Sequence, residues 1–282
     1  MDDKIANIKT TKFLLDKYQL LAKRSLGQNF IVDSNIIDRL IAHAQIDENT
    51  AVIEIGPGLG ALTQGLLEKA KKVISIEIDQ NMVEILTEVF GERKNFELIH
   101  SDILQYDLEA LIKQLNQDYA HVMLIANLPY YITSEILLKL FKLDNKVDSV
   151  MLMVQREFAQ RLTANKSTKD YRTLTVLSKT FYQSKIIMKI SKHVFYPRPN
   201  VDSAIILMRS LENEIENLDE FIQFVEICFV QKRQTIFNNL RNKLGEQKAT
   251  EILEKSNILK TTRAAELDVL DFKNMFEVYY EI

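Results

Sequence analysis

The segment Val52-Ile53-Glu54-Ile55-Gly56-Pro57-Gly58-Leu59-Gly60-Ala61 decides the fold of this chain. An apolar, β-rich run leads directly into a glycine-rich turn, and a helical pattern follows from Ala61. Strand, tight turn and helix in this order open a nucleotide-binding crossover, in which glycines let the backbone approach a ligand. Gly56 and Gly58 are therefore candidate cofactor-binding residues. Because Gly56, Gly58 and Ala61 also satisfy the relaxed dinucleotide pattern, a nicotinamide enzyme is a competing interpretation.

Three later apolar runs each lead into a polar residue. The run 72–77 ends on Glu77, about 20 residues past the first glycine, where a ribose hydroxyl is held in either class of protein. The run 96–101 leads into Asp102, an acceptor suited to the amino group of an adenine ring, and the run 121–126 leads into Asn127. Open α/β sheets place their ligand crevice at the carboxyl ends of the strands, so these side chains are candidates for one site.

The tetrad Asn127-Leu128-Pro129-Tyr130 has the groups that methylation of an exocyclic amine requires. The side-chain carbonyl of Asn127 and the backbone carbonyl of Pro129 can accept both hydrogens of an amino group. This pulls the nitrogen toward a pyramidal shape and frees its lone pair, while Tyr130 offers the ring a face for stacking. A strand end followed by a proline turn is the structural alternative. A dehydrogenase has no use for such a tetrad.

Five separated motifs carry a resemblance to a known family. They are Leu26-Gly27-Gln28-Asn29-Phe30-Ile31, the glycine turn from Glu54 to Gly60, Ile76-Glu77-Ile78-Asp79, Asn127-Leu128-Pro129-Tyr130-Tyr131-Ile132, and Phe195-Tyr196-Pro197-Arg198-Pro199-Asn200-Val201-Asp202-Ser203. With them the chain resembles the small-subunit (16S) ribosomal RNA adenine dimethyltransferases, which place two methyl groups on each of two adjacent adenosines near the 3′ end of that RNA. The related large-subunit rRNA methyltransferases that confer erythromycin resistance share most of these motifs.

The resemblance implies an S-adenosylmethionine-dependent rRNA (adenine-N6,N6-)-dimethyltransferase that acts in small-subunit biogenesis. It implies that Tyr130 and Phe195 flank the flipped adenine. It also implies a cofactor site made by Asn29, Ile31, Gly56, Glu77, Asp102 and Asn127. Three positions depart from the family's pattern. Arg172 stands where the family usually has Gly, Gln234 stands where it usually has Lys, and Ile31 replaces the commoner Leu.

Composition fits an intracellular enzyme with one large core. The chain has 282 residues and 46% apolar content, which is enough for a full α/β core and a smaller second domain. One cysteine, Cys228, excludes a disulfide framework and suits a reducing cytosol, and no apolar run is long enough for a membrane span. The four histidines are scattered, so we expect no metal site. We therefore expect a cytoplasmic monomer.

The charge distribution favours an RNA partner although the net charge is −3. Residues 151–210 hold eleven Lys and Arg against three acids, beside the predicted target pocket. A solvated basic surface is the alternative. The segment 230–240 also resembles the family's basic helical hairpin. The candidate contacts to 16S rRNA in the small ribosomal subunit are Lys23, Arg24, Arg156, Arg161, Lys166, Lys169, Arg172, Lys232 and Arg233.

The pattern predicts an α/β fold with two domains. Up to residue 211, apolar strands alternate with helical patterns, which predicts a Rossmann-like class I methyltransferase sheet with helices on both faces. Residues 1–32 are its N-terminal segment, predicted to contact cofactor and RNA. The acidic stretch 212–220 is a predicted linker, and residues 219–282 show helical spacing only, which predicts a small all-helical C-terminal domain that contacts RNA.

Four rival functions stay open on the sequence alone. The related large-subunit dimethyltransferases tend to be strongly basic, so a pI near 5.9 and a long helical C-terminal region favour the small-subunit enzyme. A DNA adenine methyltransferase would need a separate base-reading domain, which the pattern lacks. A non-catalytic assembly or transcription factor of this fold would not need Glu77, Asp102 and Asn127 together. The nicotinamide enzyme is the fourth.

Overall fold

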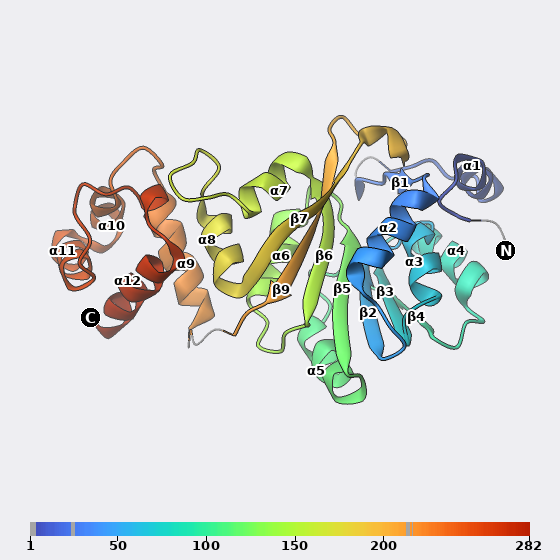
Figure 1. Ribbon diagram of the computed structural model, residues 1–282, viewed down its shortest axis with the longest axis horizontal. Helices are drawn as coiled ribbons and strands as arrows, with labels where there is room; N and C mark the ends of the chain where they lie inside the picture. Colours follow the sequence, from blue (N-terminus) through green and yellow to red (C-terminus); the bar gives the residue numbers. More distant parts are fainter. Residues whose placement is uncertain (1–3, 24–25, 213–214, 216) are drawn as a thin grey trace. The chain divides into compact units, whose positions relative to one another are not determined.

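A seven-stranded sheet forms the centre of the chain in the computed structural model, which describes residues 4–23, 26–212, 215 and 217–282 (Figure 1). Its strand order is β4-β3-β2-β5-β6-β9-β7. The first five of these strands are parallel to their neighbours, and β9 runs antiparallel to β6. The strands are β2 (Thr50–Ile55), β3 (Lys72–Glu77), β4 (Phe96–His100), β5 (His121–Asn127), β6 (Ser149–Gln155), β7 (Tyr182–Ile190) and β9 (Ser203–Ser210).

Helices connect the parallel strands and cover both faces of the sheet, as the sequence predicts. In Figure 1, α2 lies in front of the sheet and α6 lies behind it. The order is typical of a class I methyltransferase fold. The connecting helices are α3 (Ala61–Leu67), α4 (Gln80–Phe90), α5 (Leu108–Asp118) and α6 (Thr133–Phe141). Helix α2 (Ser34–Ala44) precedes β2, and α7 (Arg156–Leu162) follows β6.

The central strands are buried along nearly their whole length. All six residues of β2 are buried, and the interior residues of β5 and β6 are buried too. Helices on both faces leave such strands no exposed side, which explains their continuous apolar sequences. The parallel register then brings the carboxyl ends of β2, β3 and β5 to one edge of the sheet.

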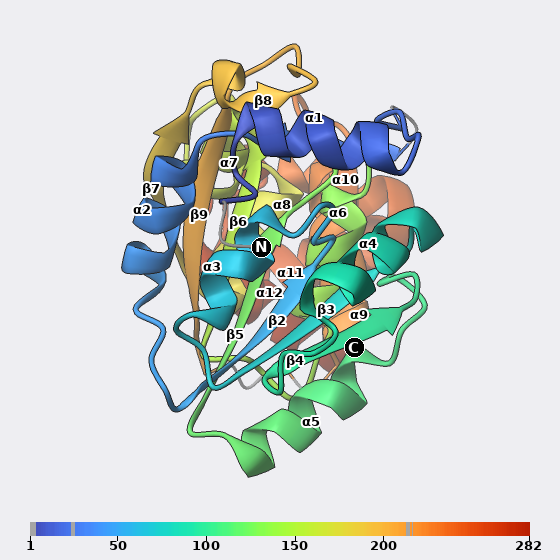
Figure 2. The same ribbon diagram turned by 90° about the vertical axis from the view of Figure 1, so that its right-hand side faces the viewer.

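A second, two-stranded sheet joins distant parts of the sequence. Here β1 (Phe30–Ile31) pairs antiparallel with β8 (Phe195–Tyr196), with Ile31 opposite Phe195. The short helix η2 (Lys192–Val194) precedes β8, and the Val32 amide donates to the Val194 carbonyl at 2.8 Å. Figure 2 shows β8 beside helix α1 (Ile8–Lys17). Two of the five sequence motifs are therefore held together by backbone pairing.

The chain divides into two compact units, of which the second comprises residues 160–184 and 211–282. Within it the Phe181 and Phe221 rings lie 6.5 Å apart, and Phe276 lies 5.3 Å from Phe221. These contacts explain why residues 160–184 group with the C-terminal helices. The domains predicted from sequence, 1–211 and 219–282, differ from the units in that segment. The helices of this unit are α8 (Thr173–Phe181), α9 (Leu218–Phe229), α10 (Ile236–Leu244), α11 (Glu246–Lys255), η3 (Ala264–Glu266) and α12 (Val269–Glu281).

The described residues contain neither a candidate membrane-spanning helix nor a candidate metal-binding group. None of their helices combines the length and apolar character needed to cross a membrane. No group of three or more His, Cys, Asp or Glu side chains in the same part of the chain is arranged to hold a metal ion.

Candidate active site

A cavity of about 210 Å³ opens at the carboxyl ends of β2 to β5. It lies within the first compact unit, which comprises residues 1–159 and 185–210. The glycine turn, the ends of three strands and the N-terminal segment 26–31 all contribute to its lining. Of the residues predicted from sequence, the structure places Asn29, Ile31, Gly56, Gly58, Glu77, Asp102, Asn127, Pro129 and Tyr130 on this one cavity.

The glycine turn gives the cavity an open backbone wall. Gly56 has φ +66°, and no atom lies within 4 Å of the position a Cβ would take there. Gly60 has φ +85° and caps α3, and a Cβ on it would lie 2.5 Å from the Phe90 ring. The first glycine therefore leaves room for a ligand, whereas the last allows close packing against α4.

Glu77 ends β3 as a buried carboxylate that is held by backbone amides. Its Oε1 accepts from the amides of Ile78 and Asp79, both at 2.9 Å, and its Oε2 accepts from the Gly58 amide at 3.2 Å. Burial raises the pKa of this carboxyl, and the backbone hydrogen bonds oppose that rise. The carboxylate thus links the end of β3 to the glycine turn and is held in position by the backbone.

Asp102 and two isoleucines form the far side of the cavity. Asp102 is half-buried, and its Oδ1 accepts from the Leu104 amide at 2.9 Å. Ile78 lines the cavity although it is 48% exposed, and Ile103 is buried beside Asp102. Sequence reasoning did not predict either isoleucine as a site residue. Each isoleucine directly follows a polar residue at a strand end, and this position could have identified both as an apolar surface for a planar ring of a ligand.

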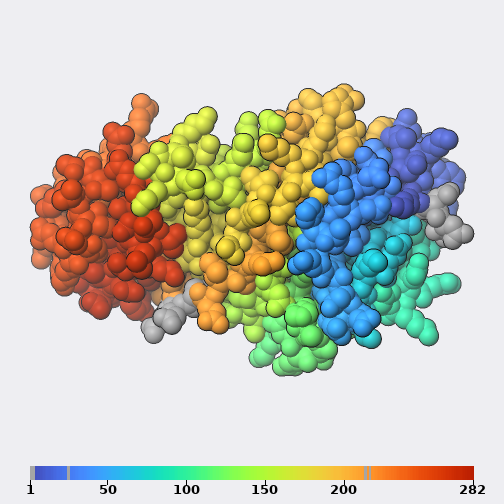
Figure 3. Space-filling view, viewed as in Figure 1, coloured from blue at the N-terminus to red at the C-terminus, as the bar shows by residue number. Residues whose placement is uncertain are grey.

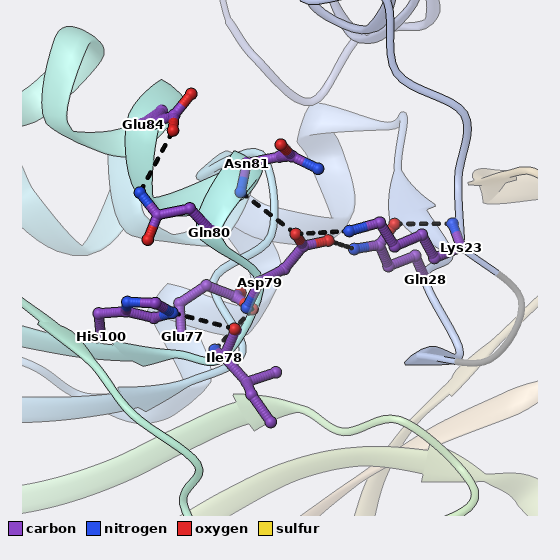
Figure 4. Close-up of polar contacts among 9 residues, drawn as sticks. All are labelled: Lys23, Gln28, Glu77, Ile78, Asp79, Gln80, Asn81, Glu84 and His100. Atoms are coloured by element: carbon purple, nitrogen blue, oxygen red, sulfur yellow. Dashed lines mark hydrogen bonds and ion pairs between the residues drawn. The ribbon is translucent and has the colours of Figure 1, made fainter.

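The N-terminal segment is fastened to the cavity by Asp79 (Figure 4). Asp79 accepts from Lys23 Nζ and from Gln28 Nε2, both at 2.8 Å, and Gln28 Oε1 accepts from the Lys23 amide at 2.8 Å. Burial alone would raise the pKa of Asp79, but Lys23 and Gln28 lower it below its ordinary value. Lys23, predicted from sequence to contact RNA, is thus ion-paired beside the cavity, and Gln28 was not predicted.

Asn127 ends β5 with its amide oriented by the N-terminal segment. Its Nδ2 donates to the Asn29 carbonyl at 3.3 Å, and no described residue donates to its Oδ1. The Pro129 carbonyl, predicted as the second acceptor, already accepts from the Ile132 amide at 3.3 Å and from Thr133 Oγ1 at 3.0 Å. These bonds use both of its lone pairs. Among the described residues, no donor reaches the neighbouring Leu128 carbonyl.

The two predicted stacking residues have different surroundings. Tyr130 is half-buried on the cavity, and its hydroxyl lies 2.8 Å from Ser203 Oγ. Burial raises the pKa of this phenol, so it is neutral and can orient the ring through that bond. Phe195 is only 4% exposed, packs in the core opposite Ile31, and does not contribute to the cavity wall. Its predicted stacking role stays a prediction that would require the β8 segment to move.

Glu54 is a buried carboxyl beneath the glycine turn. Its Oε2 accepts from Thr63 Oγ1 and Ser75 Oγ, both at 2.7 Å, while Oε1 is buried without a hydrogen-bond partner among the described residues. Burial raises the pKa of Glu54 to about 7, although both hydroxyl bonds oppose the rise and nearby Glu77 adds to it. The group lines the cavity and is protonated over much of the acid range.

The Glu54 carboxyl predicts a pH-dependent stability. In the unfolded chain it ionises near 4.5, whereas the folded protein keeps it protonated to about pH 7. The native state binds more protons across this window, so the free energy of unfolding relative to Glu54→Gln should fall as the pH rises. The fall should total on the order of 3 kcal/mol and end above pH 7. Urea unfolding of both proteins at several pH values measures it, and parallel curves would contradict it.

The other predicted RNA contacts lie on the surface, and several are engaged. Arg156 pairs with Asp202 at 3.3 Å, Lys166 pairs with Asp268 at 3.4 Å, and Lys232 donates to the Lys169 carbonyl. Exposed pairs of this kind are weak, so a phosphate can replace the carboxylate. Arg24 lies outside the described residues. The basic residues Arg161, Lys169, Arg172 and Arg233 are partly or fully exposed.

The three departures from the family's pattern have different surroundings, and Ile31 lines the cavity as described above. Arg172 has φ −152°, which is extended backbone, and it begins α8 with its amide donating to Thr175 Oγ1 at 3.1 Å. This conformation does not require glycine. Gln234 donates through Nε2 to Gln231 Oε1 at 2.5 Å, whereas its own Oε1 is buried without a hydrogen-bond partner among the described residues.

A family model described as ribosomal RNA adenine dimethylase matches residues 19–281. The chain belongs to the ribosomal RNA adenine dimethylase family. The family assignment confirms the resemblance drawn from the five motifs, and it shows that the glycine turn does not belong to a nicotinamide enzyme. The match extends beyond the sheet through the C-terminal helices.

Relatives of the dimethylase family match almost the full chain. The ribosomal RNA small subunit methyltransferase A of Bacillus licheniformis is 40% identical over 281 residues, covering 96% of each chain. The protein of the same name from Staphylococcus haemolyticus is 38% identical and covers 97% of this chain and 95% of its own.

Two solved structures support the fold. A dimethyladenosine transferase from Plasmodium falciparum has a TM-score of 0.76 and 27% identity, covering 89% of this chain and 97% of that chain. The 23S rRNA methyltransferase ErmE has a TM-score of 0.64 and 26% identity, covering 89% of this chain and 100% of that chain. The class I methyltransferase fold predicted from sequence is confirmed.

Proposed function

We propose that this protein dimethylates N6 of two adjacent adenosines near the 3′ end of small-subunit (16S) rRNA with S-adenosylmethionine. The observation that carries the proposal is the available Oδ1 of Asn127 beside the Tyr130 ring, in one cavity with Glu77 and Asp102. In this proposal Asn127 is the amine acceptor, Tyr130 the stacking face, and Glu77 with Asp102 the nucleoside-binding pair. The names of the bacterial relatives support the small subunit as substrate.

The residues that line the cavity suit the chemical groups of S-adenosylmethionine. Glu77 would hold the ribose hydroxyls, Asp102 the adenine amino group, and Ile78 the face of that ring. Because Gly56 has no side chain and the space beside it is open, the cofactor could lie directly against the backbone there. Asn29 and Ile31 would close the opposite wall. When bound, the cofactor supplies a methyl group on a positively charged sulfur, and the carboxylates around the cavity favour such a cation.

The chain's own residues would hold and activate the target base. The adenine must leave its stack, which costs a few kcal/mol, and Tyr130 returns part of this by stacking. Asn127 Oδ1 accepts one hydrogen of the amine. Because the Pro129 carbonyl already accepts two bonds, the Leu128 carbonyl is the better second acceptor. After transfer the cationic nitrogen loses its proton to solvent, and a monomethylated amine keeps one hydrogen for a second round.

Tyr130 variants should separate stacking from hydrogen bonding. We expect Tyr130→Ala to lower the second-order rate constant for methylation by about 10–100-fold, because one stacking face is lost. Tyr130→Phe keeps the ring and loses only the Ser203 bond at 2.8 Å, so its rate should fall less than about fivefold. Single-turnover assays with labelled cofactor measure both. Equal losses in the two variants would show that the ring does not stack on the substrate.

We propose that the small ribosomal subunit is the partner of this protein. We also propose that the protein acts in the cytoplasm as a monomer. Single-stranded or splayed bases are read by stacking, and helical RNA by its backbone. The exposed basic residues predicted from sequence, Arg161, Lys169, Arg172 and Arg233 among them, would supply phosphate contacts beyond the target hairpin. The large-subunit alternative is less favoured, because the bacterial relatives at 38–40% identity are small-subunit enzymes by name, whereas ErmE is 26% identical.

One assay tests the proposed function. Purified protein and labelled S-adenosylmethionine are incubated with undermethylated bacterial small subunits, with large subunits, with DNA and with a naked oligonucleotide of the hairpin sequence. We expect N6,N6-dimethyladenosine in the small subunit and strong preference for the particle over the oligonucleotide. Methylation of large subunits instead would show that the protein is a large-subunit rRNA adenine dimethyltransferase. If no methyl group is transferred to any of these substrates, the result would favour a non-catalytic assembly factor.

A further inference from the structure

The outer face of α1 carries two lysines and an exposed phenylalanine that the proposed active site does not use. Lys9 and Lys12 are exposed, and Phe13 is 58% exposed. Their spacing of three and four residues places them on one side of the helix. The opposite side is buried through Leu14 and Leu15. Figure 3 shows α1, in dark blue, at the surface of the molecule.

The same helix borders the candidate active site. Thr11 of α1 lines the cavity, as does Ile5 just before the helix, so the inner side of this segment is a wall of the site. On the outer side, Lys12 Nζ lies 5.4 Å from the centroid of the Tyr196 ring, which belongs to β8. Figure 2 shows α1 and β8 side by side. A strand of RNA that delivers a base to Tyr130 would therefore pass near this face.

The charges of this face are not neutralised within the described chain. Lys4 pairs with Asp38 at 2.8 Å and Lys17 pairs with Glu88 at 2.5 Å, so two basic residues of the segment have carboxylate partners. No described carboxylate lies within ion-pair distance of Lys9, Lys12 or the exposed Arg198 that follows β8. Asp16 is the acid on the exposed side of α1. An excess of positive charge therefore surrounds an exposed aromatic ring.

We propose that Lys9, Lys12 and Phe13 of α1, together with Arg198, bind the single-stranded RNA that flanks the flipped adenosine. Lysines and the arginine would contact phosphates, and Phe13 would stack on a neighbouring base, because every base presents a π-face. Extrusion of the target leaves its neighbours partly unstacked, and an exposed ring compensates for this loss. The inference rests on the proposed function and adds to it the surface that receives the flanking strand.

Binding of the intact protein to undermethylated bacterial small subunits, measured across a range of salt concentrations, tests the inference. Lys9→Ala/Lys12→Ala should weaken binding and flatten the plot of log affinity against log salt by roughly 1.4, since each single-strand phosphate contact contributes about 0.7. Phe13→Ala should weaken binding about tenfold with an unchanged slope. The matched control Lys69→Ala/Lys113→Ala removes the same charge from exposed positions outside the cavity wall and should change neither quantity.

The outcomes separate this inference from the proposed function. If the wild type binds and methylates small subunits while the α1 variants match it, the α1 surface is wrong and the proposed function stands. Weaker binding with an unchanged salt slope in the double lysine variant would mean that a ribosomal protein is contacted, which also overturns the inference. If the wild type neither binds nor methylates the particle, both fail. Cofactor affinity and thermal unfolding, expected to equal wild type, show that the variants are folded.

Discussion

Replacing Asn127 with alanine should lower the rate of methyl transfer by roughly 10²–10³-fold while binding to the small subunit persists. The Oδ1 of Asn127 is an acceptor held at the end of β5, and no described residue competes for it. A group positioned in advance stabilises the developing charge on the attacking nitrogen without reorganisation. Single-turnover rates at saturating cofactor and enzyme isolate this chemical step, and gel-shift or filter binding reports RNA affinity separately.

The Asn127→Ala substitution also removes the hydrogen bond that the Asn127 side chain donates to the N-terminal segment. Asn127 Nδ2 donates to the Asn29 carbonyl at 3.3 Å, so part of any effect could come from a looser N-terminal segment. Asn116→Ala is the matched control, because Asn116 Nδ2 donates to the Lys146 carbonyl at 3.1 Å on an exposed part of the same unit. We expect this control to turn over at the wild-type rate. Wild-type turnover by Asn127→Ala would refute the active-site assignment.

Much of the site was predictable because it depends on the order of strands. Buried parallel strands have continuous apolar sequences, so the ends of β2, β3 and β5 are visible as the points where Gly56, Glu77 and Asn127 interrupt them. Asp102 follows the edge strand β4, whose shorter and mixed sequence is a weaker signal. A parallel sheet then brings consecutive ends to one edge, whatever the lengths of the helices between them. The family resemblance, now confirmed, added the N-terminal segment with Asn29 and Ile31, which no strand pattern would place there.

The remaining contacts depend on tertiary register, which sequence periodicity does not contain. The pairing of Ile31 with Phe195 spans most of the first unit and buries Phe195. The two bonds to the Pro129 carbonyl arise because α6 begins at Thr133 without a side-chain cap at Ile132. The hydrogen bond from Gln28 to Asp79 likewise joins two motifs that are far apart in the sequence, and neither motif alone predicts the contact.

The compact units differ from the predicted domains in one segment, for a related reason. Residues 160–184 precede the acidic stretch 212–220 that suggested a linker, yet they pack with the C-terminal helices. The contact between Phe181 and Phe221 is the physical cause, and it joins two apolar helices on either side of that stretch. A composition change marks where the chain is exposed and charged, but it does not show which earlier segment a later core will recruit.

Replacing Glu77 with alanine should weaken S-adenosylmethionine binding by about 10–100-fold, which corresponds to roughly 1.5–3 kcal/mol for the loss of a charged acceptor. This carboxylate accepts from the amides of Gly58, Ile78 and Asp79, so it holds the glycine turn against β3 as well as offering lone pairs to ribose hydroxyls. The alanine loses both contributions. Glu77→Gln retains one side-chain oxygen and should bind with intermediate affinity.

Titration calorimetry on the wild type and these variants measures the effect directly, without turnover. Glu97→Ala is the matched control: this glutamate lies on the neighbouring strand β4, is exposed, and pairs with Lys72 at 2.8 Å, so its loss should leave cofactor affinity unchanged. Burial of Glu77 opposes its ionisation, so removing it relieves part of a desolvation cost and the fold should survive. An unchanged dissociation constant in Glu77→Ala, with the protein folded by circular dichroism, would show that the nucleoside half of the cofactor binds elsewhere.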